Sequence, residues 1–77
     1  MKVTLGELKA GECGMITAFP DGSSTYRRKL LAMGLTPGTR FTVSRVAPLG
    51  DPIQLQVRGF QLSVRRHEAT AVEVSRI

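Results

Sequence analysis

The sequence predicts a small, mainly β protein: an antiparallel barrel of about five strands with one short inserted α-helix, in a single domain spanning residues 1–77. Three observations lead to this fold class. A chain of 77 residues has the size of one domain. Apolar residues recur at helical spacing from residue 26 to 33, whereas after Gly38 they alternate with polar ones, as in half-buried antiparallel strands. A barrel hides the edges that a flat sheet would expose.

The first 19 residues are expected to form one helical turn and one strand. Thr4 is a typical helix N-cap, and Glu7 lies three residues later, where its carboxylate can return a hydrogen bond to the cap. Residues 13–19 are predicted to form a strand, which the Pro-Asp-Gly sequence at residues 20–22 ends.

A short helix with a defined end is predicted between the capping segment 23–25 and Gly34. Gly34 has the position where helices commonly end in a left-handed residue, and Leu35 is expected to fold back onto the helix. The basic side chains of residues 27–29 are expected to face solvent. Three apolar side chains share one face of this helix: Tyr26, Leu30 and Met33.

The remaining strands follow from alternation after Gly38. Val46 breaks the alternation and is interpreted as a β-bulge. Arg58 and Gly59 form a predicted two-residue hairpin turn, and residues 66–68 a short polar link. The alternation of Phe60 with Leu62 predicts that Phe60 is buried. The alternating segments that predict strands cover residues 40–46, 53–58, 60–65 and 71–75.

The composition excludes several classes of protein. A single cysteine, Cys13, allows no disulfide within the chain, which fits a reducing compartment. No apolar run approaches the roughly 20 residues that cross a bilayer, and no signal peptide is evident, so a cytoplasmic protein without membrane insertion is expected. The sequence also lacks a phosphate-binding loop and paired carboxylates, so we expect no enzyme activity.

The net charge of +5 suggests an anionic partner, although net charges of about 2 to 8 are ordinary for a small domain. One basic group comprises residues 27–29, and Arg58, Arg65 and Arg66 are expected to form another. Nucleic acid is not the expected partner, because binding of single strands needs exposed aromatic side chains. The chain has three Phe, one Tyr and no Trp.

Several blocks, in this order, resemble a known family. Residues 31–38 read Leu-Ala-Met-Gly-Leu-Thr-Pro-Gly, residues 47–52 read Ala-Pro-Leu-Gly-Asp-Pro, and Gly59 and the segment 62–68 follow. Their order and spacing are similar to those of the ferrous iron transport protein A (FeoA) family. The resemblance implies an SH3-like barrel and a cytoplasmic role beside a membrane Fe(II) transporter that carries a GTP-binding domain. It also implies a likeness to the C-terminal domain of iron- and manganese-dependent repressors.

Two side chains of the sequence are typical transition-metal ligands, Cys13 and His67, whereas a closed zinc site usually needs four. Carboxylates can complete a poorer site, because Glu12 adjoins Cys13 and Glu68 adjoins His67. Our hypothesis is that no cofactor is required, and that any bound Fe(II) or Zn(II) lies at the surface near Cys13, His67 and Glu68, bridging a homodimer. The alternative is that His67 is a solvated turn residue and Cys13 a small, partly buried side chain.

Partner contacts are predicted on the exposed edges of the helix. Tyr26 and the basic side chains Arg27 and Arg28 are expected to border an apolar groove between the helix and the barrel. The alternative is that the groove's other apolar residues are plain core: Leu30, Leu31, Met33 and Leu35.

The segment 47–52 is the second predicted contact. Its two prolines and Gly50 predict a rigid corner that presents Leu49 to a partner. The alternative is that the corner only sets strand register.

Two functions are compatible with these residues. The first is a non-enzymatic accessory protein that binds the ferrous-iron transporter and modulates uptake. The second is a metal-responsive regulatory domain, which would need a metal site built from few available ligands.

Overall fold

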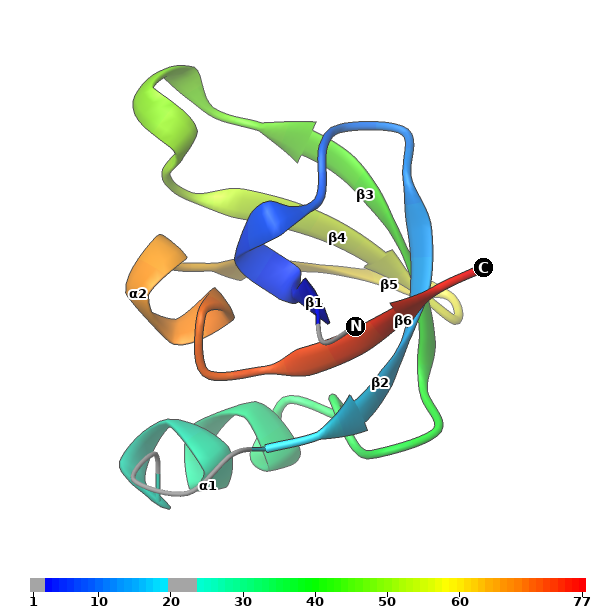
Figure 1. Ribbon diagram of the computed structural model, residues 1–77, viewed down its shortest axis with the longest axis vertical. Coiled ribbons are helices and arrows are strands. Elements are labelled where there is room, and N and C mark those ends of the chain that lie inside the picture. Colours follow the sequence, from blue (N-terminus) through cyan, green and yellow to red (C-terminus); the bar gives the residue numbers. More distant parts are fainter. Residues whose placement is uncertain (1–2, 20–23) are drawn as a thin grey trace.

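The computed structural model describes residues 3–19 and 24–77, with the side chains of residues 24–26 excepted. In this part of the chain, one antiparallel sheet curls around the core in the order β1-β6-β2-β3-β4-β5 (Figure 1). The strands are β1 (Val3–Thr4), β2 (Cys13–Ala18), β3 (Arg40–Val46), β4 (Ile53–Val57), β5 (Phe60–Val64) and β6 (Glu73–Arg76). The helical elements are η1 (Leu5–Glu7), α1 (Ser24–Ala32), η2 (Pro48–Gly50) and α2 (Arg66–Ala69).

The predicted fold class, a mainly β barrel with a short inserted helix, is confirmed. The sheet has a sixth strand in the described residues because β1, only two residues long, pairs with β6. Two residues are too few to show alternation, so the sequence could not reveal it. A closed barrel without exposed edges was expected. In the described residues, β1 and β5 are the two end strands of the sheet, so two edges remain.

The core lies inside the curled sheet, under η1 and α1. Alternation predicted its members in β3 and β4, and the turns supply others. None of the described helices is long and apolar enough to cross a membrane. The buried apolar side chains are Leu5, Leu8, Ile16, Leu30, Leu35, Phe41, Val43, Ile53, Leu55, Val57, Val64, Ala69, Val72 and Val74.

The helix α1 ends as predicted. Gly34 has a φ of 97°. Its N–H donates to the Leu31 carbonyl (3.0 Å), and the Leu35 N–H donates to the Leu30 carbonyl (2.9 Å). These bonds form a Schellman motif, and Leu30 and Leu35, the residues that commonly form its apolar contact, are both buried in the same core cluster. The predicted turn at residues 20–22 and the helix cap at residues 23–25 fall outside the described residues and side chains.

The turn at the N-terminus is also confirmed. The Glu7 carboxylate accepts hydrogen bonds from the Thr4 N–H (2.7 Å) and the Thr4 hydroxyl (3.1 Å). A bulge interrupts β3, although its extra residue is Ser44 rather than Val46, between the pairs Val43–Leu55 and Arg45–Gln54. The local sequence therefore predicted the capped turn at Thr4 and placed the bulge within two residues of its observed position.

The corner between β3 and β4 is rigid, as its prolines predict. The Ala47 N–H donates to the Pro52 carbonyl (3.0 Å), and the Gly50 N–H donates to the Ala47 carbonyl (2.9 Å). At the tip, Leu49 has a φ of 71° and a side chain that is 100% exposed.

Two predictions about local structure are wrong at residues 60 and 66–68. Residues 66–68 are not a polar link, because α2 forms there and its Glu68 is buried at 4% exposure. Phe60 is not buried but 42% exposed, because it begins the terminal strand β5 beside the predicted Arg58–Gly59 turn. On an edge strand, an alternating apolar side chain can remain exposed because no neighbouring element packs over it.

Candidate functional site

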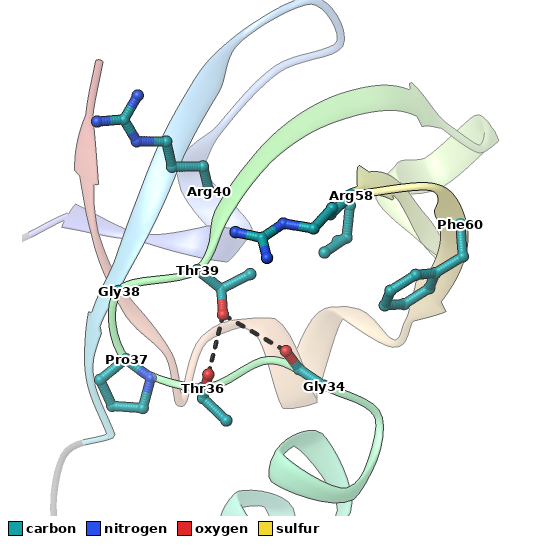
Figure 2. A pocket seen from close by; sticks show the side chains of 9 residues that line it. Gly34, Thr36, Pro37, Gly38, Thr39, Arg40, Arg58 and Phe60 are labelled. Carbon is teal, nitrogen blue, oxygen red and sulfur yellow. Dashed lines mark hydrogen bonds between the residues drawn. The ribbon is translucent and has the colours of Figure 1, made fainter.

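A groove of about 690 Å³ lies between residues 34–40 and the β4–β5 hairpin (Figure 2). It is not the groove expected beside α1, because Leu30 and Leu35 of that set are fully buried. The observed groove begins where the helix has ended. Its lining residues are Gly34, Thr36, Pro37, Gly38, Thr39, Arg40, Val57, Arg58 and Phe60.

The first wall is a turn held against β2. The Gly38 N–H donates to the Ile16 carbonyl (2.7 Å), and the Ile16 N–H donates to the Thr39 carbonyl (2.9 Å). The hydroxyls of Thr36 and Thr39 pair at 3.0 Å, and the Thr39 hydroxyl also faces the Gly34 carbonyl at 3.4 Å (Figure 2). This wall is therefore prearranged by internal hydrogen bonds.

The second wall is the hairpin at residues 57–60. The Phe60 ring packs over Gly34, where a Cβ would lie 3.3 Å from Phe60 Cζ. Val57 is buried beneath the groove and Phe60 is half-exposed, so the hairpin supplies apolar surface.

The groove carries positive charge. In Figure 2 the Arg58 side chain crosses the groove toward Thr39, whereas the Arg40 guanidinium lies at the rim and points away. Both arginines also line a second hollow of about 410 Å³ beside Cys13 and Ile77. None of the lining residues of the groove is acidic, and neither arginine has an acidic partner among the described residues.

The expected basic group of Arg58, Arg65 and Arg66 does not form. Arg58 lies in the β4–β5 turn, whereas Arg65 and Arg66 follow β5 at the other end of the hairpin. There Asp51 accepts the Arg66 N–H (3.1 Å) and lies 3.8 Å from Arg65 Nη1. The register of the hairpin, which composition does not reveal, separates these charges.

The predicted metal ligands lie in different elements. Cys13 begins β2, is exposed, and its Sγ lies 3.4 Å from Thr42 Oγ1. His67 and Glu68 lie in α2, on the opposite side of the barrel from β2 in Figure 1. Within the described residues, no group of three or more His, Cys, Asp or Glu side chains could hold a metal ion. The donor set of the described residues does not fit a resident metal centre.

Glu68 has a structural partner instead. Its carboxylate accepts hydrogen bonds from Lys29 Nζ (2.5 Å) and the Arg65 N–H (3.1 Å). Burial raises the pKa of Glu68, but the hydrogen bonds from Lys29 and Arg65 and the charge of Lys29 together lower it below its usual value. Lys29, expected to face only solvent, thus ties α1 to α2.

The predicted partner contacts are dispersed. Arg27 and Arg28 are exposed on α1, while the Tyr26 side chain lies outside the described part. Leu49 is fully exposed at the β3–β4 corner. Sequence reasoning missed the groove residues Arg40, Arg58 and Phe60 as a set. The available signal was an Arg-Gly turn followed directly by Phe at the start of a strand.

Comparison with known proteins identifies the family. The model of the FeoA domain matches residues 3–76. The chain belongs to the FeoA domain family. A Porphyromonas gingivalis protein, described as a fusion of Fe(2+) transport protein A and the Fe(2+) transporter FeoB, is 34% identical over 73 residues. These residues are 95% of this chain and 8% of that protein, so the chain spans a small part of this relative.

Solved structures of FeoA proteins share the fold. The FeoA-like protein from Clostridium acetobutylicum is 33% identical with a TM-score of 0.89, covering 99% of this chain and 87% of that one. FeoA of Stenotrophomonas maltophilia, described as an SH3 domain protein in complex with zinc, is 25% identical with a TM-score of 0.80, covering 95% and 89%. These matches confirm the SH3-like fold.

A manganese-dependent transcriptional repressor in complex with manganese also has this fold. It is 17% identical with a TM-score of 0.90, covering 99% of this chain and 37% of the repressor. At this identity the likeness concerns the fold alone.

Proposed function

We propose that this chain is a cytoplasmic, non-enzymatic accessory protein of bacterial ferrous iron uptake. It binds the Fe(II) membrane transporter, which carries a cytoplasmic GTP-binding domain, and modulates the activity of the transporter. The single observation that carries the proposal is the relative in which a FeoA region and a FeoB transporter form one chain. Fusion holds two domains at a high effective concentration, which is useful where they act together.

The described structure supports a binding role. It offers a preformed basic groove and an exposed apolar tip at Leu49. Both are surfaces that gain a contact when a partner covers them.

Co-purification and calorimetry with the cytoplasmic part of the transporter test the proposal. We expect association in at least one of the nucleotide-free, GDP-bound and GTP-analogue-bound states. An unrelated basic domain of equal net charge is the control for simple charge attraction. Absence of association in all three states would contradict the proposal.

The contact residues are a further part of the proposal. Tyr26, Arg27 and Arg28 on α1 and Leu49 at the corner are proposed to touch the transporter. Arg27→Glu with Arg28→Glu should weaken association if α1 faces the partner, because charge reversal opposes an acidic surface. Unchanged affinity in this double variant would exclude that face.

The alternative function is a metal-responsive regulatory domain, because Cys13, His67 and Glu68 are side chains of types that bind transition metals. In this case Fe(II) or Zn(II) would bind at the surface near Cys13, His67 and Glu68 and bridge two chains. Titration of Fe(II) or Zn(II) into the wild type and a His67→Ala variant, with sedimentation to detect dimers, tests this site. Equal affinities would exclude His67 as a ligand, and a monomer at saturating metal would exclude the bridge.

A further inference from the structure

We propose that the groove between residues 34–40 and the β4–β5 hairpin binds an acidic, extended segment of the transporter's cytoplasmic part, anchored by an apolar side chain. This inference rests on the proposed function and deepens it by naming the site and the chemistry of the partner.

Charge is the first argument. Most of the acids with described contacts are engaged away from the groove: Glu7 with Thr4, Glu12 with Lys9 and Arg76, Asp51 with Arg65 and Arg66, and Glu68 with Lys29. Arg58 crosses the groove without an acidic partner in the described part of the chain (Figure 2). A guanidinium group in this position can accept a partner carboxylate with two parallel hydrogen bonds.

Apolar surface is the second argument. Pro37, Val57 and the half-exposed ring of Phe60 line the same groove as Arg58. An acidic segment with a large apolar side chain matches both features, because the ring covers the apolar group while the arginine meets the carboxylate.

The hydrogen bonds of the wall disfavour a phosphate ligand. A backbone phosphate site offers several free N–H groups. Here the N–H groups of Gly34, Gly38 and Thr39 already donate within the chain, and the two threonine hydroxyls pair with each other. Arg58 and the rim residue Arg40 are therefore the main donors, which suits carboxylates spaced along a peptide.

Two charge-reversal variants test the site on the transporter. Arg58→Glu should raise the Kd for the cytoplasmic part at least about fivefold, as expected for an ion pair turned into repulsion, with a smaller effect for Arg40→Glu at the rim. The matched control is Arg45→Glu, since Arg45 is exposed on β3 and does not line the groove. Its Kd should stay within about twofold of the wild type.

If Arg58→Glu and Arg45→Glu weaken binding equally, or neither does, the groove inference is wrong while the proposed function stands. If the wild type does not bind the transporter at all, the proposed function fails, and a second measurement decides the groove.

That measurement uses NMR of the labelled chain with a peptide probe, Glu-Glu-Phe-Glu-Glu, and its matched Gln-Gln-Phe-Gln-Gln control. The acidic probe should shift the amide signals of residues 34–40 and 57–60, with weaker shifts from the glutamine probe and a loss of binding in Arg58→Glu. Shifts spread over the whole surface, or none, would overturn the inference. Shifts in this groove with GDP but not with the acidic peptide would assign it to a nucleotide and also overturn the inference.

Discussion

The two ends of the β4–β5 hairpin differ in how their charges are used. At the end near α2, Asp51 meets Arg65 and Arg66, and Glu68 meets Lys29. At the turn, Arg58 and nearby Arg40 meet no acidic group in the described part of the chain. Charges at the first end hold elements of the fold together, while those at the second are available to a partner. Position on the hairpin, not residue type, separates the arginines that have an acidic partner from the one that has none among the described residues.

The largest expected effect is at the paired end. Glu68→Ala removes the buried acceptor of Lys29 and of the Arg65 N–H. We expect a loss of about 2 kcal/mol in the free energy of unfolding, because a charge-assisted hydrogen bond and a helix cap disappear together. Urea denaturation at pH 7 measures it, and Glu68→Gln should recover part of the loss. If Glu68→Ala were as stable as the wild type, this end would not hold the fold together.

The pH dependence sharpens the same point. The pKa of Glu68 is lowered in the folded protein, so its ionised form adds stability above its unfolded pKa of about 4.3. This stability is lost as the pH falls through the lower, folded pKa. The gap in unfolding free energy between wild type and Glu68→Gln should be open at neutral pH and should close in acid. A gap that persists unchanged at acidic pH would contradict the ion pair.

At the groove end, Gly34→Ala should reduce stability by about 1–2 kcal/mol, because Gly34 has a φ of 97°. The new Cβ would also lie 3.3 Å from Phe60 Cζ. Gly38→Ala is the matched control, since its φ is 92° and no atom of the described residues lies within 4 Å of its Cβ position. A larger loss for Gly34→Ala, measured by thermal denaturation, would show that Phe60 packs on this wall; equal losses would show that it does not.

The two ends of the hairpin can also be compared through two glycines, Gly50 in the corner beside one end and Gly59 in the turn at the other. Gly50 and Gly59 both have a φ of 80°. A Cβ on Gly50 would lie 2.5 Å from Arg66 Nη1, whereas a Cβ on Gly59 would have no heavy atom of the described part of the chain within 4 Å. Each Gly→Ala change should cost about 1 kcal/mol of unfolding free energy. Because the end of an arginine side chain can move, the two losses should differ by less than about 0.5 kcal/mol. A much larger loss at Gly50 would show that Arg66 is fixed over the corner.

The smallest effect on stability is expected for Leu49→Ala. Its side chain is fully exposed, so the unfolding free energy should change by less than about 0.5 kcal/mol. Association with the transporter should weaken if the corner is a contact. Ile77→Ala is the control for stability alone, because Ile77 is also an exposed apolar side chain but lies beside the hollow that Arg40 and Arg58 line. If Leu49→Ala leaves both folding and association intact, the contact role of Leu49 is excluded.

Local chemistry predicted most of the fold. The end of α1 at Gly34, the turn at Gly59 and the cap of Glu7 on Thr4 each depend on residues a few positions apart, and each was found. The helix α2 was missed because four residues carry too little periodicity. It is stabilised by Lys29, which lies 39 positions before Glu68.

The groove was harder to predict for a similar reason. Its walls come from residues 34–40 and 57–60, which approach one another only after the sheet has curled. The alternation that places Leu55 in the core also argued for a buried Phe60. Sequence period indicates which face a side chain takes, but not whether another layer covers that face. Exposed aromatic and basic side chains at a sheet edge therefore need a structure to be recognised as one site.

The pairing of β1 with β6 has a consequence for chain connectivity. Val3 lies opposite Val74 in an antiparallel pair, so the chain enters β1 and leaves β6 at the same end of this pair. A short flexible linker could therefore join these ends, and new termini could be opened at the exposed Arg58–Gly59 turn, since such surface turns tolerate cleavage. The fold is therefore a candidate for circular permutation, in which the strands follow one another along the chain in a different order while each keeps its neighbours in the sheet.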